Sequence, residues 1–200
     1  MDAAAWDERY AASELVWSAG PNQFVESELA GLPPGRALDL ACGEGRNARW
    51  LAGRGWRVTA MDFSATAVEK GRRLDAERGV EVEWQVGDAV SAELPADLDL
   101  VVIAYLQIGD DERRRVWRRA FESLAPGGRF LLVGHDSTNL TEGTGGPQDP
   151  AVLYTAEDVL AALGDESSAS PAYEIVRAER VGRQVGEDLA WDVLVHLVRA

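Results

Sequence analysis

The sequence contains 200 residues, 46% hydrophobic and 27% charged, which is typical of one globular domain with a full core. Its 34 acids and 20 bases give a net charge of −14, which repels a nucleic-acid backbone and favours a small-molecule partner. The sequence shows no basic leader and no apolar run of about 18 residues, so we expect a cytoplasmic protein without a membrane partner.

Residues 1–30 predict one or two helices that form an N-terminal cap. Apolar residues such as Trp6, Tyr10 and Phe24 recur there at helical spacing, with acids between them. Glycines and prolines at 31–35 then break the pattern, and a short apolar run follows at once. We therefore expect the first strand to begin directly after this break.

The segment Arg36–Asn47, RALDLACGEGRN, predicts a strand, a glycine turn and the start of a helix over 46–54. Gly43 and Gly45 can adopt positive φ and let a ligand approach, because neither carries a Cβ. The helix beyond them offers unpaired N–H groups to that ligand. The spacing also fits the G-x-G-x-x-A form of a dinucleotide fingerprint. Asp39, however, would repel a pyrophosphate and attract a cation, so we expect a nucleotide ligand that carries positive charge.

The next two strands are also predicted to lead into an acid. The second strand is expected over 57–62 and the third, which alternates with period two, over 80–86. A helix with Ser64 as its N-cap is expected between them. Asp62 and Asp88 would then join the acid of the first strand along one edge of a parallel sheet. Open α/β folds bind their ligands at that edge.

The second half of the chain continues the alternation of strands and helices. The fourth strand is almost wholly apolar, as a strand buried on both faces must be. The expected bounds are 98–104 for the fourth strand, 110–124 for an arginine-rich helix, 125–129 for a turn, 130–134 for the fifth strand, 155 onward for a helix, and 173–185 with 190–198 for a hairpin. This order predicts a doubly wound α/β sheet with an antiparallel pair at its edge.

Three motifs together resemble the class I S-adenosylmethionine-dependent methyltransferases. They are the turn at 39–47, the segment WRVTAMDFS at 56–64 and the triplet Gly-Asp-Ala at 87–89, within a resemblance that covers residues 36–135. The resemblance implies a single Rossmann-like domain with a seven-stranded, mostly parallel sheet, an antiparallel last strand and helices on both faces. Within the class, the chain looks most like the TehB-type tellurite-resistance and related small-molecule methyltransferases. Ala41 departs from the family, which more often has glycine there.

The resemblance implies that S-adenosyl-L-methionine binds at the acid-lined edge. Asp62 would accept hydrogen bonds from two ribose hydroxyls, and Asp88 from the adenine amino group. Phe63 would either form a wall against the adenine or belong to the core. Arg46 would pair with the methionine carboxylate, with the adjacent glutamate or with solvent. The residues expected at the cofactor are Tyr10, Asp39, Ala41, Gly43, Gly45, Arg46, Asn47, Asp62, Phe63, Asp88, Ala89 and Ala104.

The implied reaction is an in-line displacement at a methyl carbon, which requires aligned reactants and exclusion of water. A soft nucleophile such as a thiolate needs little more, whereas a hydroxyl needs a base. His135 is the best candidate for that base, paired with Asp136, or it is simply packed at a strand end. Tyr105 either contacts the substrate or covers the sheet. His196 lies within the last strand and is predicted to be structural.

Residues 136–154 form the longest segment between predicted elements, and glycine and proline are frequent in it. Long loops inside compact domains are usually lids, binding loops or disordered segments. We expect a lid on the substrate side, with disorder as the alternative.

Other functions fit the sequence less well. Two histidines and the single cysteine, Cys42, lack metal-ligand spacing, so we expect no metal site. The main rival is an NAD(P)-dependent Rossmann oxidoreductase. That rival leaves Asp39 and Asp88 without a role, and Lys70, the only lysine, cannot complete a Tyr-x-x-x-Lys relay. A non-catalytic protein that binds S-adenosylmethionine is a third alternative. The methyl acceptor and the choice between monomer and homodimer stay open.

Overall fold

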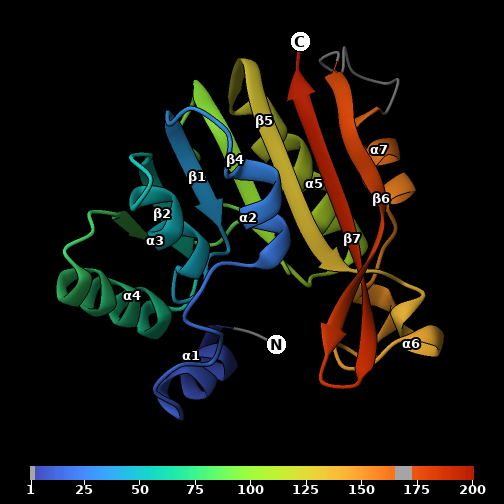
Figure 1. Ribbon diagram of the computed structural model, residues 1–200, viewed down its shortest axis with the longest axis horizontal. Coiled ribbons are helices and arrows are strands. Elements are labelled where there is room, and N and C mark those ends of the chain that lie inside the picture. Colours follow the sequence, from blue (N-terminus) through green and yellow to red (C-terminus); the bar gives the residue numbers. More distant parts are fainter. Residues whose placement is uncertain (1–2, 165–172) are drawn as a thin grey trace.

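The computed structural model describes residues 3–164 and 173–200 (Figure 1). Within these residues, seven strands form one sheet in the order β3-β2-β1-β4-β5-β7-β6. β1 to β5 run parallel to one another, whereas β7 is antiparallel to both β5 and β6. The strands are β1 (Arg36–Leu40), β2 (Arg57–Asp62), β3 (Glu83–Val86), β4 (Leu98–Ala104), β5 (Leu124–His135), β6 (Tyr173–Val185) and β7 (Asp188–Arg199). The expected doubly wound fold with an antiparallel last pair is confirmed.

Helices cover both faces of the sheet and enclose two hydrophobic cores (Figure 1). Val101 and Val102 of β4 are fully buried and belong to different cores, which explains why this strand is apolar throughout. The cores on the two faces involve α2, α3 and α4 on one side, and α5 and α7 on the other. The helical segments are α1 (Ala3–Ala11), α2 (Gln23–Leu29), α3 (Arg46–Ala52), α4 (Ala65–Arg78), α5 (Asp110–Glu122), α6 (Asn139–Glu142), the 3₁₀ turn η1 (Pro150–Val152) and α7 (Ala156–Leu163).

Two helix starts that the local sequence predicts are present. The Ser64 hydroxyl accepts from the N–H of Ala67 and starts α4. Thr155 and Asp158 form a reciprocal capping box at the start of α7. The bounds expected for β2 and β4 also agree with the structure.

Two expected strand starts are wrong, each because of a contact that the local pattern does not show. β3 begins at Glu83 and not at Val80, because the Val80 N–H is held by the Asp75 carbonyl at the end of α4. β5 begins at Leu124, which pairs with Leu98 of β4. The expected turn at 125–129 is instead an irregularity inside β5.

The strand order reverses between β1 and β4, and ligands of open α/β sheets bind at such a point. We call the edge where β1, β2, β4 and β5 end the carboxyl edge. Figure 1 shows α1, α6 and the tip of the β6–β7 hairpin beyond this edge, at the bottom of the view. These three segments therefore flank the place where the site is expected.

Candidate functional site

The turn after β1 is built from residues in the left-handed backbone region. Ala41, Gly43 and Gly45 have φ of 58°, 55° and 72°. This conformation is costly for Ala41, which carries a Cβ, and such strain is concentrated at functional sites. A Cβ at Gly43 would lie 2.6 Å from the Tyr10 hydroxyl. At Gly45 it would lie 2.2 Å from the Trp84 ring, so the glycine at position 45 serves packing inside the protein.

Asp39 is a fully buried acid, and one of its two carboxylate oxygens accepts no hydrogen bond. One carboxylate oxygen accepts from the N–H of Ala48, in the first turn of α3, at 2.9 Å. The other oxygen, Oδ1, is buried without a hydrogen-bond partner. Burial raises the pKa of Asp39 to about 7, against the opposing effects of the Ala48 N–H and the Arg46 guanidinium. A buried, unpartnered oxygen of this kind fits a cationic ligand that can donate a hydrogen bond.

Asp62, at the end of β2, holds the glycine turn by hydrogen bonds and keeps acceptor positions free for a ligand. Its carboxylate accepts from the Gly43 N–H at 2.7 Å and from the Ser64 N–H at 2.9 Å. Burial raises its pKa, although both N–H groups oppose this shift. Each carboxylate oxygen keeps a further acceptor position, so ribose hydroxyls can still be accepted. β1 and β2 pair side by side, with Leu40 opposite Met61, so Asp39 and Asp62 lie near the same ends of neighbouring strands.

The remaining members of the predicted cofactor site are spread over the same edge. Asp88 is exposed, and its carboxylate accepts from the Val90 N–H in the turn after β3. Ala89 is buried, whereas Phe63 and Ala104 are partly buried. The structure thus brings Asp39 and Asp62 together, with Asp88 after the next strand. Their contacts with a cofactor stay predictions.

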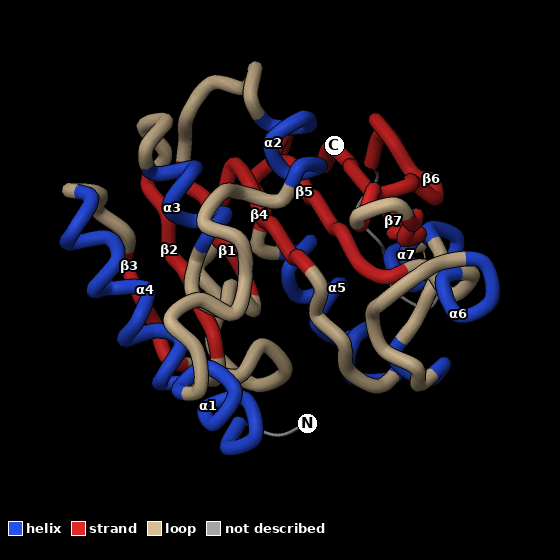
Figure 2. Tube along the Cα trace, turned by 60° about the horizontal axis from the view of Figure 1, so that its bottom comes forward, coloured by secondary structure: helices blue, strands red, loops and turns tan. Residues whose placement is uncertain are grey.

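Residues 3–18, which we call the strap, cross the glycine turn. Tyr10 is buried with its hydroxyl against Gly43, and that hydroxyl accepts from the Trp17 indole N–H at 3.2 Å. The Trp6 ring stacks on Tyr10. Asp7 accepts from the Thr66 N–H, and in Figure 2 α1 lies beside α4. Tyr10 therefore lies at the glycine turn, and its contact with a cofactor stays a prediction.

A buried ion pair that the sequence analysis missed fastens the strap. The Lys70 ammonium lies 2.7 Å from Glu44 and also donates to the carbonyls of Tyr10 and Ser13. Glu44 in turn accepts from the N–H of Val16 at 3.0 Å. The presence of a single lysine in an arginine-rich chain was the available signal for this contact.

Arg46 and Asn47 connect the start of α3 to segments that precede the sheet. Arg46 donates to the Ser18 hydroxyl at 3.0 Å, and the alternative that it pairs with Glu44 is wrong, because Lys70 occupies that carboxylate. Asn47 accepts from the backbone N–H of Asn22 at 2.9 Å. A pairing of Arg46 with a methionine carboxylate stays a prediction.

A second cluster of polar side chains lies after β4 and β5, on the other side of the strand-order reversal. Tyr105 follows β4 with a φ of 61°, and its ring centroid lies 4.8 Å from that of His135 at the end of β5. The Tyr105 hydroxyl donates to Asp192 of β7 at 2.7 Å, and His135 Nδ1 lies 3.2 Å from the same carboxylate. We call Tyr105, His135, Arg183 and Asp192 the acceptor cluster.

The expected pairing of His135 with Asp136 is wrong. Asp136 turns back on its own loop and accepts from the N–H and the hydroxyl of Thr138. The partner of His135 is Asp192, which sequence reasoning missed. An acid inside an apolar strand, as in Ala-Trp-Asp-Val-Leu at 190–194, was the signal that could have revealed it.

Asp192 is fully buried but is held in its charged form. Burial alone would raise its pKa, but its contacts with His135, Arg183 and Tyr105 outweigh burial and hold the pKa below its ordinary value. The Arg183 Nε donates to it at 2.6 Å. The acceptor cluster is therefore a preformed, charge-balanced network.

The segment 136–154 docks on the hairpin through Asn139. Asn139 accepts from the Trp191 N–H at 2.7 Å and donates to the Gly145 carbonyl at 2.8 Å. A Cβ at Gly146 would lie 3.0 Å from His135 Nδ1, so this loop packs directly on the histidine. Its function as a lid stays a prediction.

The second histidine and the cysteine lie outside this chemistry. His196 is buried between Glu28 and Arg129, in the middle of β7. Burial, together with the charges of Asp39 and Asp62, raises the pKa of the Cys42 thiol, which disfavours it as a nucleophile.

None of the described helices is long and apolar enough to cross a membrane.

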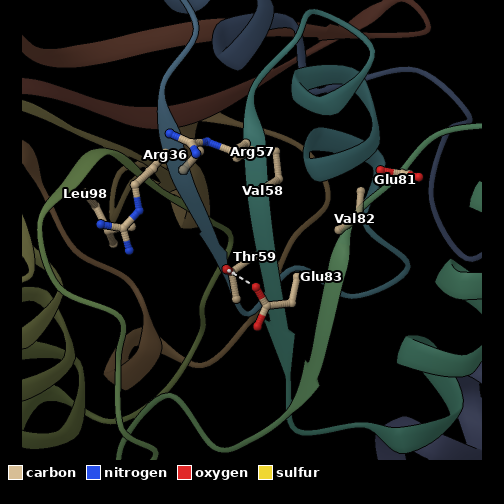
Figure 3. A pocket seen from close by; sticks show the side chains of 9 residues that line it. Arg36, Arg57, Val58, Thr59, Glu81, Val82, Glu83 and Leu98 are labelled. Atoms are coloured by element: carbon tan, nitrogen blue, oxygen red, sulfur yellow. Dashed lines mark hydrogen bonds between the residues drawn. The ribbon is translucent and has the colours of Figure 1, made fainter.

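A cavity of about 400 Å³ opens at the opposite edge of the sheet (Figure 3). Arg36 and Arg57 of β1 and β2 lie on one side of it and Glu83 of β3 on another, with a hydrogen bond between Thr59 and Glu83. These residues lie at the amino ends of β1 and β2 and on the short edge strand β3. Because open α/β sheets bind ligands at the carboxyl edge, we do not assign this cavity to the site.

Comparisons with known proteins agree with the fold and the turn. A family model described as a methyltransferase domain matches residues 37–128. Sarcosine/dimethylglycine N-methyltransferase of Halorhodospira halochloris is 34% identical over 125 residues, which are 60% of this chain and 40% of that protein. The structure of TehB from Haemophilus influenzae superposes with a TM-score of 0.74 at 15% identity, covering 90% of this chain and 63% of that chain.

Residues 37–128 are similar to a methyltransferase domain, and the seven-stranded sheet has the strand arrangement expected of the class I methyltransferases. S-adenosylmethionine is the cofactor of this class, and the unpartnered oxygen of Asp39 beside the glycine turn suits its positive charge. Ribosomal RNA small subunit methyltransferase C of Chromohalobacter salexigens is also similar, with 32% identity over 153 residues, or 66% of this chain and 45% of that protein. The chain spans less than half the length of both curated relatives.

Proposed function

We propose that this protein transfers a methyl group from S-adenosylmethionine to a small-molecule acceptor in the cytoplasm. The observation that carries the proposal is Asp39, a buried acid with one unpartnered oxygen, next to the glycine turn and the start of α3. A pyrophosphate would be repelled there, whereas a ligand with an ammonium and a sulfonium group would be stabilised. This argument favours the methyl donor over a nicotinamide dinucleotide.

Several residues of the carboxyl edge would hold the donor. Asp39 would accept from its ammonium group, and Asp62 from its ribose hydroxyls. Asp88 would accept from the adenine amino group, while Tyr10 and the strap would cover the turn. When bound, S-adenosylmethionine supplies an electrophilic methyl group on a positively charged sulfur. The protein then has to align the acceptor with that group and keep water out.

Two properties of the molecule support a small acceptor over a nucleic acid. The net charge of −14 opposes the approach of a phosphate backbone. The strap covers one side of the edge, and the segment 136–154 packs against His135 on the other. A small molecule can be enclosed between two such covers more readily than a folded RNA.

Calorimetry with S-adenosylmethionine, its demethylated product, NAD and NADP tests the assignment. We expect binding of the first two and none of the nicotinamide cofactors. Asp39→Asn removes the negative charge and should weaken binding of the methyl donor. Asp111→Asn, on the exposed side of α5, is the matched control and should bind normally. Binding of NAD alone would reject the proposal.

Mass detection of methylated products separates an enzyme from a protein that only binds the cofactor. The purified protein would be incubated with S-adenosylmethionine and a panel of phenols, thiols, amines, carboxylates and tellurite. At least one acceptor should gain a methyl group while the demethylated cofactor accumulates. Binding without turnover on any acceptor would favour the non-catalytic alternative.

A further inference from the structure

We propose that Asp192 is a positioning residue that orients His135 as the general base for an acidic hydroxyl acceptor, a phenol or an enol. This inference rests on the proposed function and names the substrate class of the same site. It assigns a role to Asp192, an acid on β7 that comes 57 residues after His135 in the sequence.

The first argument is the completeness of the contacts around Asp192. Its side chain is fully buried. One oxygen, Oδ2, accepts from the Tyr105 hydroxyl at 2.7 Å and from Arg183 Nε at 2.6 Å. The other oxygen, Oδ1, lies 3.2 Å from His135 Nδ1 and 3.5 Å from Arg183 Nη2. Tyr105 and Arg183 therefore fix the carboxylate, and one of its oxygens faces the histidine.

The second argument is the orientation that this carboxylate imposes on the imidazole. Nδ1 is close enough to Asp192 for an ion pair, although its N–H does not point straight at the oxygen. A small rotation of the ring would align the two, and catalytic hydrogen bonds often tighten only when substrate is bound. Because Nδ1 faces the acid, the proton of the neutral ring belongs on Nδ1. Nε2 is then the free acceptor.

The third argument is the place of this pair relative to the cofactor side. His135 ends β5 and Tyr105 follows β4, and β4 lies next to β1, which carries Asp39. Asn22 links the two sides, because its backbone N–H donates to Asn47 of α3 and its side chain donates to the Tyr105 hydroxyl at 3.3 Å. His135 and the glycine turn therefore lie at the same edge of the sheet. Asn22 links the two sides of this edge through its hydrogen bonds to Asn47 and Tyr105.

The proposed step balances without any further reactant. The acceptor hydroxyl gives its proton to His135 Nε2, and its oxygen forms a bond to the methyl carbon. The carbon–sulfur bond breaks, and its electron pair stays on the sulfur. The products are a methyl ether, the neutral thioether and an imidazolium whose positive charge faces Asp192. The proton is then released to solvent.

The same geometry selects the chemical class of the acceptor. A thiolate or another soft anion would need no base. A phenol or enol has a pKa within a few units of neutrality, so a histidine can remove its proton, whereas a simple alcohol is far too weak an acid. The acceptor cluster is also charge-balanced, because Arg183 already pairs with Asp192. It offers no spare cation for an anionic acceptor.

Methyl transfer by the full chain to matched phenols, thiols and amines tests the inference. We expect phenols to be methylated in preference to the other two classes. Asp192→Asn should slow phenol methylation by at least roughly tenfold, and His135→Gln by the roughly 10²-fold or more that is typical of a lost general base. Calorimetric binding of S-adenosylmethionine should be unchanged in both. Asp188→Asn, at the exposed start of β7, should match the wild type.

Nitrogen NMR of the His135 ring gives a readout that a merely structural Asp192 would not change. The wild type should show the proton on Nδ1, and Asp192→Asn should shift the population toward the Nε2 tautomer. If that variant does not fold, the wild-type tautomer and His135→Gln still decide the matter. A wild-type Nε2 tautomer, or methylation of thiols without phenols, would overturn the inference. Failure to bind S-adenosylmethionine would instead reject the proposed function itself.

Discussion

On the cofactor side of the carboxyl edge, Asp39 and Asp62 accept hydrogen bonds from backbone N–H groups at most 19 residues away in the sequence. On the acceptor side, Asp192 accepts from side chains, and one of them, Tyr105, lies 87 residues away. On the cofactor side, the acids are therefore held by backbone N–H groups. On the acceptor side, the acid is held by side chains that come from distant parts of the sequence. Substitutions should affect the two sides differently.

The largest expected effect concerns the pair that fastens the strap on the cofactor side. Glu44→Gln leaves the buried Lys70 ammonium without its counter-charge, and breaking a buried pair in this way costs ~3–5 kcal/mol. Urea unfolding should show a loss of that size in the free energy of unfolding. Glu69→Gln is the matched control, because the Glu69–Arg72 pair is exposed and should contribute less than about 1 kcal/mol. Equal losses in the two variants would contradict a structural role for the buried pair.

The next largest effect should come from Asp62, which holds backbone N–H groups and is expected to hold the ribose. Asp62→Ala should weaken binding of S-adenosylmethionine by ~1–3 kcal/mol, the cost of leaving hydrogen-bonding partners unsatisfied. Calorimetry measures this directly, with circular dichroism to verify that the variant is folded. Unchanged affinity in a folded variant would remove Asp62 from the cofactor site.

Cofactor binding should also depend on pH through Asp39. Burial raises the pKa of this acid to about 7, so ionisation of Asp39 opposes folding. Its contribution to stability is therefore complete below the unfolded pKa and is lost as the pH rises through 7. A cationic ligand needs the ionised form, so binding should be roughly tenfold weaker at pH 6 than at pH 8. Asp39→Asn should abolish this slope, and a wild-type affinity independent of pH would contradict the assignment.

The smallest effect is expected on the acceptor side. Tyr105→Phe removes one hydrogen bond to Asp192 but leaves Arg183 and His135 in place. The loss in the free energy of unfolding should be about 0.5–1.5 kcal/mol. Binding of S-adenosylmethionine should not change, since Tyr105 belongs to the side-chain network. A variant that lost cofactor affinity would show that the two sides are not separable.

The same contrast explains what the sequence could predict. β2 and the Ser64 cap were found correctly because apolar alternation and capping are local properties. The start of β5 was missed because Leu124 is drawn into the sheet by Leu98, a contact that no local pattern shows. The position of His135 at a strand end predicts its place at this edge. Its partner could not be found, because Asp192 reaches it only through the antiparallel pairing of β5 with β7.

Lys70 is the only lysine in the sequence, and its amine is enclosed by Glu44 and the carbonyls of the strap. Amine-directed reagents therefore find no surface lysine on this protein. A label that does reach the side chain of Lys70 reports a moment at which residues 3–18 have lifted from the glycine turn. The sequence thus contains its own lysine probe of access to the ligand edge, with no engineered residue required.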